Sequence, residues 1–322
     1  PAGKVRMLQW SAEEDTQAMP QHFAQLSDPH LSGLEDINPA DLFNKRALGY
    51  LSWRRKRRFE HRREVLDALQ HDLEHNAPEQ LLITGDLTHI GLPLEFEQAR
   101  DWLQQMGDPS QIALVPGNHD ACAAAPWDKT FALWEAYMAG DENTPQSGEH
   151  TSFPSLRIRG EIAFIGLSTA CPKPPLMATG TVGAAQLSQL PALLKSAGDQ
   201  GLFRVVYLHH CPIVGREKWR KRLTDADKLQ AILQKHGAEL VLHGHGHRAH
   251  YSELPTQQGN LPVIAVPSAS ALGLHGADIA HYNRYAVHRT DQGWQLHIAM
   301  RGFEPGLGEF REDQEKTVEL RR

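Results

Sequence analysis

Short apolar runs alternate with amphipathic segments of helical length along most of this chain, and no other feature restricts its fold as strongly. Residues 22–28, HFAQLSD, are typical of a strand that ends in a polar loop, whereas residues 61–76 place their valine and leucines on one face of a helix. Strands that alternate with helices form sheets whose faces are covered by those helices. The sequence therefore predicts an α/β fold.

The same pattern locates most of the remaining elements. Three later segments, residues 261–266, 284–290 and 293–300, look like successive strands joined by turns, so part of the sheet should be antiparallel. No internal repeat or low-complexity linker interrupts residues 21–322, which we expect to form one domain. Residues 1–20 are interpreted as an N-terminal extension, either native or vector-derived, outside that fold. Further strands are expected within 81–86, 112–120, 162–168, 203–210 and 239–245, and further helices within 94–106, 184–198 and 225–237.

Charge and cysteine content narrow the functional classes. The 33 basic and 39 acidic residues give a formal net charge of -6, so the whole surface has no general attraction for nucleic acid or an anionic membrane. Cys122, Cys171 and Cys211 are an odd number of widely spaced cysteines, which favours reduced thiols in a cytoplasmic protein. No apolar run approaches the length of a membrane span, and the N-terminal residues lack the pattern of a signal peptide.

Polar motifs follow five of the predicted strands directly: LSDPH, ITGDLTH, LVPGNHD, YLHH and VLHGHGH. The carboxyl edge of an α/β sheet is where separate loops assemble a site. Oxygen and imidazole donors together suit Mn, Fe or Zn better than the all-oxygen sites of Ca or Mg. Seven donors are too many for one ion, whereas two ions sharing a carboxylate would use them well. The donors are Asp28, His30, Asp86, Asn118, His209, His245 and His247.

The order of these motifs resembles that of the calcineurin-like metallophosphoesterases. The chain has DPH at 28–30, GD at 85–86, GNHD at 117–120, His209, and GHGH at 244–247, in the order of the family signature. The resemblance implies a four-layer α/β/β/α sandwich with two mixed sheets and a dinuclear metal site at the strand ends. It also implies a phosphoester hydrolase that uses two divalent transition metal ions, Mn, Fe or Zn.

Carried over position by position, the resemblance divides the ligands between the two ions. One ion would be held by Asp28, His30, Asp86 and His247, and the other by Asp86, Asn118, His209 and His245, so that Asp86 bridges them. A metal-bridging hydroxide would attack phosphorus in line. His119, oriented by Asp120, would donate a proton or hydrogen bond to the leaving oxygen. We place His210 behind the ligands or in the core, and His243 and His250 outside the signature.

The substrate is less well defined than the reaction. The GDxVDRG pattern of the Ser/Thr phosphatases of this superfamily is absent, and the chain leaves little room for the additional regions of its DNA-repair nucleases. A phosphodiesterase is favoured, with a cyclic nucleotide phosphodiesterase or a UDP-diacylglucosamine pyrophosphohydrolase of lipid A synthesis as alternatives. A metal-binding scaffold without activity is the alternative of another class. The expected partner is a small-molecule or lipid-linked phosphoester, and nucleic acid is disfavoured by the net charge.

An insert at about residues 36–60 separates the DPH motif from the first predicted helix. Within residues 41–63, Phe43 and other aromatic residues are interspersed with many lysines and arginines. One interpretation is a solvated basic helix that docks its apolar residues on the domain. Because the insert leaves directly from a ligand loop, we expect instead a cap whose arginines bind phosphate and whose aromatic residues receive an organic group. The expected substrate-binding residues are Arg46, Tyr50, Trp53, Arg54 and Arg57, and such a cap would suit a substrate at a membrane surface.

Overall fold

The computed structural model describes residues 20–321 except 32, 36, 43–44, 143–149 and 152. The expected N-terminal extension lies outside the described residues apart from Pro20, and so does Phe43 of the insert. The three cysteines are free. No helix in the described ranges combines the length and apolar character needed to cross a membrane.

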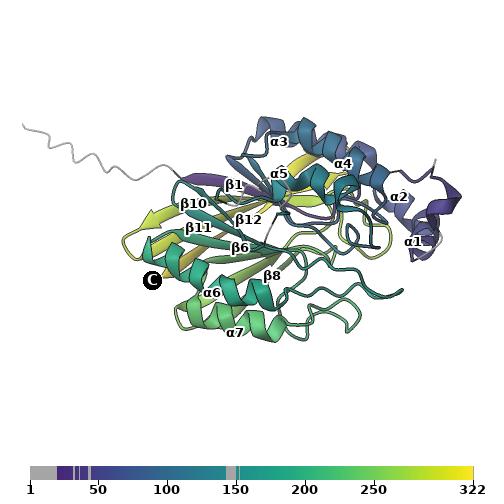
Figure 1. Ribbon diagram of the computed structural model, residues 1–322. Coiled ribbons are helices and arrows are strands. Elements are labelled where there is room, and N and C mark those ends of the chain that lie inside the picture. Colours follow the sequence, from purple (N-terminus) through teal and green to yellow (C-terminus); the bar gives the residue numbers. More distant parts are fainter. Residues whose placement is uncertain are drawn as a thin grey trace, which may run out of the picture.

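Two mixed sheets, each of six strands within the described residues, lie against each other in the centre of the molecule (Figure 1). In the first sheet, β1, β2 and β3 are parallel, and β10 pairs antiparallel with β1. Its order is β12 (Glu309–Arg321), β11 (Gly293–Glu304), β10 (His281–Thr290), β1 (Gln21–Leu26), β2 (Gln80–Ile83), β3 (Ile112–Leu114).

The second sheet has a parallel centre with an antiparallel strand at each edge. Strands β5, β6, β7 and β9 are parallel, while β4 and β8 run the other way. Its order is β4 (Ser155–Arg159), β5 (Ile162–Leu167), β6 (Phe203–Leu208), β7 (Leu240–His243), β9 (Gly259–Ala265), β8 (His250–Thr256).

Helices cover the outer face of each sheet (Figure 1). The first sheet packs against α3 (Arg63–His75), α4 (Pro93–Met106) and α5 (Glu135–Met138). The second packs against α6 (Ala184–Asp199) and α7 (Ala226–His236). The predicted α/β/β/α sandwich with two mixed sheets is therefore confirmed.

The central strands are apolar on both faces because each face is buried. In β1, Leu26 packs toward the helices, whereas Phe23 points between the sheets, where its ring stacks 4.7 Å from that of Tyr285 and meets Phe164 edge-on. In β5, Phe164 lies between the sheets and Ile165 lies under α6. Burial on both faces explains the continuous apolar runs that predicted these strands.

One expectation about the last strands needs correction, and one strand was not predicted. Residues 261–266 and 284–290 do not form neighbouring strands, because β9 belongs to the second sheet and β10 to the first. Strand β12 was not expected from the sequence. It is an edge strand that pairs with β11 alone, and most of its side chains are exposed. Its sequence is therefore mostly charged and lacks the alternation of apolar and polar residues that would have indicated a strand.

The described part of the insert consists of short helical turns that dock on the loop after β2. Trp53 is buried with Leu34, Ile90 and Leu92. Arg46 donates hydrogen bonds to the carbonyl oxygens of Ile90 at 3.2 Å and Gly91 at 2.7 Å. The insert comprises η1 (Pro39–Leu42), α1 (Arg46–Ser52), a π-helical turn η2 (Trp53–Arg57) and α2 (Arg58–Glu60), and two further short helices are η3 (Trp127–Lys129) and η4 (Phe131–Trp134).

Candidate metal centre

The predicted ligands meet at the carboxyl ends of β1, β2 and β3 in one sheet and of β6 and β7 in the other. Donor atoms within 4.8 Å of one another form three groups: Asp28 with His30 and His247, Asp28 with Asp86 and His209, and His209 with His210 and His245. The seventh donor, Asn118 Oδ1, lies 3.2 Å from His209 Nε2. The structure therefore brings all the predicted ligands into one cluster.

Hydrogen bonds orient the histidine rings of this cluster so that they can bind a cation. The Nδ1 atom of His30 lies 2.8 Å from the Thr88 carbonyl oxygen, and that of His209 lies 2.7 Å from the Thr84 carbonyl oxygen. Each Nδ1 therefore donates a hydrogen bond, which leaves Nε2 as the atom that a metal ion would bind. The Nε2 atoms of His30 and His245 are buried and have no hydrogen-bond partner among the described residues. A bound metal would satisfy both atoms.

The electrostatics of the cluster also favour positive charge between the carboxylates. Burial lowers the pKa of His30 and His245 well below the usual value, which keeps both imidazoles in the neutral form that binds metal. For His209, burial is the largest single effect and acts in the same direction. The Asp86 carboxylate, 3.3 Å from Nε2, together with Asp28 and the Thr84 carbonyl oxygen outweighs it and raises the pKa to about 9. The centre is therefore a place where a cation is stabilised.

The backbone at the ligands is unusual. Five of them have positive φ angles: Asp28 at 50°, His30 at 43°, Asp86 at 59°, His245 at 67° and His247 at 52°. The only other described residue besides glycine with positive φ is Leu176. This conformation costs roughly 1–2 kcal/mol for a residue with a side chain, and such strain is concentrated at functional sites. The loops therefore hold the donors in place at the expense of stability.

Two glycines of the GHGH motif allow a matched test of this packing. A methyl group on Gly244 would collide with Ser27 Oγ and lie 2.6 Å from Asp28 Oδ2, whereas on Gly246 the nearest atom would be Glu217 Oε1 at 3.4 Å. We expect Gly244→Ala to lower the free energy of unfolding by about 1–3 kcal/mol and to reduce bound metal. Gly246→Ala should leave both unchanged. Thermal unfolding and metal analysis of the purified variants test this, and equal behaviour would contradict it.

The structure corrects the role predicted for Asp120. Its carboxylate does not contact the His119 ring. It accepts hydrogen bonds from the backbone N–H groups of Asp86, Thr88 and Gly117, each at 2.9 Å, and from the Thr88 hydroxyl at 3.0 Å. Burial and the nearby Asp86 raise the pKa of Asp120 to about 7. Asp120 therefore ties the GD loop to the GNHD loop and does not orient the His119 ring.

His119 is held by the loop after β2 and by the insert. Its Nδ1 lies 2.6 Å from the His89 carbonyl oxygen, so Nδ1 is the donor, and Nε2 accepts a hydrogen bond from Arg57 Nη2 at 2.9 Å. Burial, followed by the charge of Arg57, lowers the pKa of His119 to about 3. His119 is therefore neutral and lies beside a fixed positive charge.

Of the five expected substrate-binding residues, Arg57 lines the cavity that reaches most of the ligands, and Trp53 lines another cavity together with the ligand His30. The first cavity, of about 550 Å³, is also bounded by Asp86, Asn118 and His119. Arg46 and Trp53 are buried in the contact between the insert and the Ile90 loop, Tyr50 stacks on Trp53 at 5.6 Å, and Arg54 is exposed. Arg46 and Trp53 thus attach the insert to the domain, and a substrate-binding role of these four residues stays a prediction.

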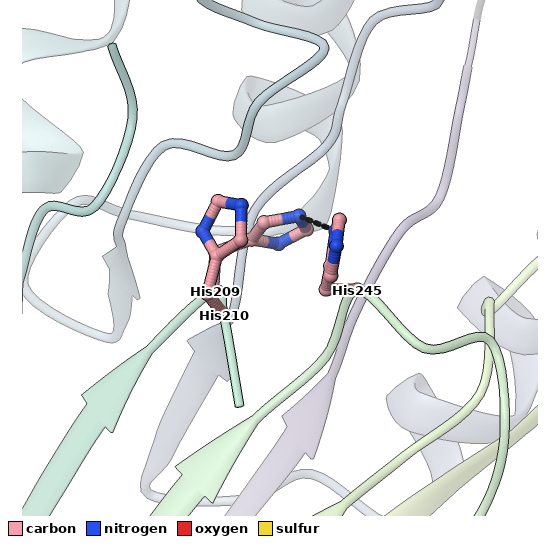
Figure 2. Close-up of side chains that lie close together, drawn as sticks. All are labelled: His209, His210 and His245. Carbon is pink, nitrogen blue, oxygen red and sulfur yellow. Dashed lines mark hydrogen bonds between the residues drawn. The ribbon is translucent and has the colours of Figure 1, made fainter. Parts of the chain in front are cut away.

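Three further histidines surround the ligands. His61 and His89 lie with ring centroids 4.5 and 5.0 Å from that of His30, and the sequence motifs did not identify them, although His89 follows Asp86 by three residues. His210 contacts Thr169 Oγ1 and the Ala178 carbonyl oxygen through its two ring nitrogens. Both ring nitrogens of His210 therefore have protein partners, whereas His245 Nε2 has none among the described residues. Figure 2 shows the three rings side by side, with the contact of 3.2 Å between His209 Nε2 and His245 Nδ1.

Solved structures resemble this fold. A dimetal phosphatase from Danio rerio superposes with a TM-score of 0.60 at 12% identity, covering 94% of this chain and 100% of that one. A purple acid phosphatase from yellow lupin seeds superposes with a TM-score of 0.55 at 13% identity, covering 94% of this chain and 54% of that one. At these identities the likeness concerns the fold alone.

Two relatives are similar in sequence. The chain is 30% identical over 181 residues to a probable cyclic nucleotide phosphodiesterase from Synechococcus sp., covering 55% of this chain and 61% of the relative, so the match spans less than two thirds of that protein. It is 30% identical over 208 residues to a 3′,5′-cyclic-nucleotide phosphodiesterase from Nostoc sp., covering 62% and 67%.

The model of the calcineurin-like phosphoesterase family matches residues 21–249, a range that begins at β1 and ends just after the GHGH motif. That range contains every donor of the cluster described above. Motif order, fold and site geometry thus agree, and this chain belongs to the calcineurin-like phosphoesterase family.

Proposed function

We propose that this protein is a phosphodiesterase that acts on small-molecule nucleotide diesters with two divalent transition metal ions. The observation that carries the proposal is the cluster of carboxylate, amide and imidazole donors at the ends of strands from both sheets. The names of the two relatives support a cyclic nucleotide as the first substrate to test.

The chain's donors fit two ions that share Asp86. His30 and His247 are grouped with Asp28 and could hold one ion with it. Asn118 and His245 lie next to His209 and could hold the other ion with it. When bound, such ions acidify water and stabilise the charge that develops on a phosphoryl group. The Asp28 and Asp86 carboxylates neutralise only part of the charge of two divalent ions, so an anionic phosphoester is attracted to the site.

Arg57 and His119 complete the proposed machinery. A phosphate oxygen entering the cavity would replace His119 as the acceptor for Arg57 Nη2, which now lies 2.9 Å from His119 Nε2. Nε2 carries no hydrogen in this neutral form, so it would have to take up a proton from solvent as the anionic substrate enters and Arg57 turns to the phosphate. The protonated Nε2 would then face the leaving oxygen, while the Nδ1 hydrogen bond to the His89 carbonyl oxygen holds the ring in position. We assign His119 to the proton or hydrogen bond that the leaving oxygen needs.

Metal removal tests the proposal directly. Purified protein should contain close to two transition metal ions per chain and hydrolyse bis(p-nitrophenyl) phosphate. Chelation should abolish the rate, and Mn, Fe or Zn should restore it, because the donor set suits these ions. A substrate series of 3′,5′-cyclic AMP, an aryl diester, p-nitrophenyl phosphate and a nucleotide-sugar pyrophosphate would establish the preference. Metal-loaded protein that leaves all of them intact would favour the scaffold without activity.

A further inference from the structure

Positively charged side chains without acidic partners gather around the cavity of the metal centre. Some arginines elsewhere form ion pairs, as Arg204 does with Glu239 at 2.8 Å and Arg301 with Asp72 at 2.7 Å. Around the cavity, no ion pair joins the basic residues to a carboxylate of the described chain, although the net charge is -6. These residues are Lys56, Arg57, Lys218, Lys221 and Arg248.

Two carboxylates line the cavity beside these cations, Asp86 of the centre and Glu60 of the insert, and Glu60 is already engaged. Glu60 accepts hydrogen bonds from the backbone N–H groups of Gly273 at 2.6 Å and Leu274 at 2.9 Å, and it lies 3.0 Å from His275 Nδ1. Glu60 therefore fixes the end of the insert to the loop before β10. The five basic side chains that line the cavity outnumber its two carboxylates.

Lys218 and Lys221 lie on one turn that is anchored to the site. The Lys221 N–H donates to the Lys218 carbonyl oxygen at 2.7 Å. The neighbouring Arg220 carbonyl oxygen accepts from the Ala178 N–H at 2.9 Å, and the Ala178 carbonyl oxygen in turn contacts His210 Nε2 at 3.2 Å. This lysine turn, residues 218–221, is therefore held in place beside the metal ligands by backbone contacts.

The lysine turn and the insert bound the same cavity from different segments. Lys45 of the insert donates to the Met177 carbonyl oxygen at 3.3 Å, next to the residues that anchor the turn. Lys221 lines this cavity together with the ligand His245. Trp219, which is 63% exposed, adds an aromatic face to the turn.

A simple phosphodiester carries one negative charge, and two bound metal ions with Arg57 would suffice to bind it. Lys218 and Lys221 add positive charge that the binding of a single phosphodiester group does not require. We infer that these lysines form a second anion subsite, so that the substrate is a diester bearing a second phosphate, such as a cyclic or linear dinucleotide. This inference rests on the proposed function for the position of the first phosphate. Trp219 would offer a surface on which a base can stack.

The test compares two ligands that differ by one phosphate, adenosine 5′-monophosphate and adenosine 3′,5′-bisphosphate, by calorimetric titration of the metal-loaded protein. The wild type should bind the bisphosphate about tenfold more tightly, as two additional charge contacts at an exposed surface would give. K218Q/K221Q should lose most of this preference, and K218R/K221R should keep it. The control K228Q, an exposed lysine on α7, should match the wild type.

Two results separate the failure of the subsite from that of the proposed function. Equal affinity of the wild type for both ligands, or an unchanged preference in K218Q/K221Q, would overturn the second subsite even if bis(p-nitrophenyl) phosphate is hydrolysed. A preference that depends on the lysines, in protein that hydrolyses no diester, would support the subsite and overturn the phosphodiesterase proposal. With active protein, kcat/KM should be higher for a cyclic dinucleotide than for 3′,5′-cyclic AMP.

Discussion

Asp86→Ala is expected to lower kcat/KM for bis(p-nitrophenyl) phosphate by about 10³-fold or more and to release bound metal. Asp86 belongs to a donor group with Asp28 and His209, and its Oδ1 accepts the His119 backbone N–H at 2.7 Å. Alanine would thus remove the donor that both ions are proposed to share and also free the GNHD loop. Steady-state kinetics and metal analysis of the same preparation measure both effects.

The matched control for Asp86→Ala is Asp108→Ala. Asp108 is exposed, and its side chain accepts a hydrogen bond from the Ser110 N–H at 2.8 Å, at the end of the sheet away from the ligands. Activity and metal content of this control should equal those of the wild type. If Asp86→Ala protein keeps its full metal content and most of its activity, Asp86 is not the shared ligand.

His119→Ala should separate catalysis from metal binding. The His119 ring contacts the His89 carbonyl oxygen and Arg57, and it is in none of the donor groups, so metal content should stay at the wild-type level. Loss of a positioned proton donor should lower kcat by about 10²–10⁴-fold. The loss should be largest for a nucleotide diester, whose leaving alkoxide needs a proton, and smaller when p-nitrophenolate leaves.

An exposed histidine, His75 at the end of α3, provides the control for this variant. His75→Ala should hydrolyse both kinds of diester at the wild-type rate. A His119→Ala protein that has lost its metal would show that the residue belongs to the ligand set. Equal losses on the two leaving groups would instead assign it to phosphate binding.

The ligands could be predicted from the sequence because each of them lies just beyond an apolar strand. Asp28 and Asp86, for example, follow β1 and β2 within a few residues, and strand ends in an α/β sheet converge on one edge. Local sequence therefore fixes both the type of donor and its place in the fold. The same local signal explains why the predicted helices at 94–106 and 184–198 correspond closely to α4 and α6.

Residue roles that depend on contacts between distant segments could not be predicted in this way. The Asp120 carboxylate accepts hydrogen bonds from the backbone N–H groups of Asp86 and Thr88, more than thirty residues earlier. The Arg46 guanidinium donates a hydrogen bond to the carbonyl oxygen of Ile90. In the sequence, a buried arginine that docks an insert looks the same as one that binds phosphate. The segment REKWRKR, 216–222, rivals the insert in basic and aromatic character, yet no motif distinguishes it.

The donors of the metal centre come from both sheets. Asp28 and Asp86 follow strands of one sheet, whereas His209 and His245 follow strands of the other, and each sheet packs against its own set of helices. Bound ions would thus act as a cross-link between the two halves of the sandwich. A ligand that binds only the folded state at 100 times its Kd stabilises that state by about 2.7 kcal/mol. Cells starved of metal would then lose the protein itself to proteolysis, in addition to its activity.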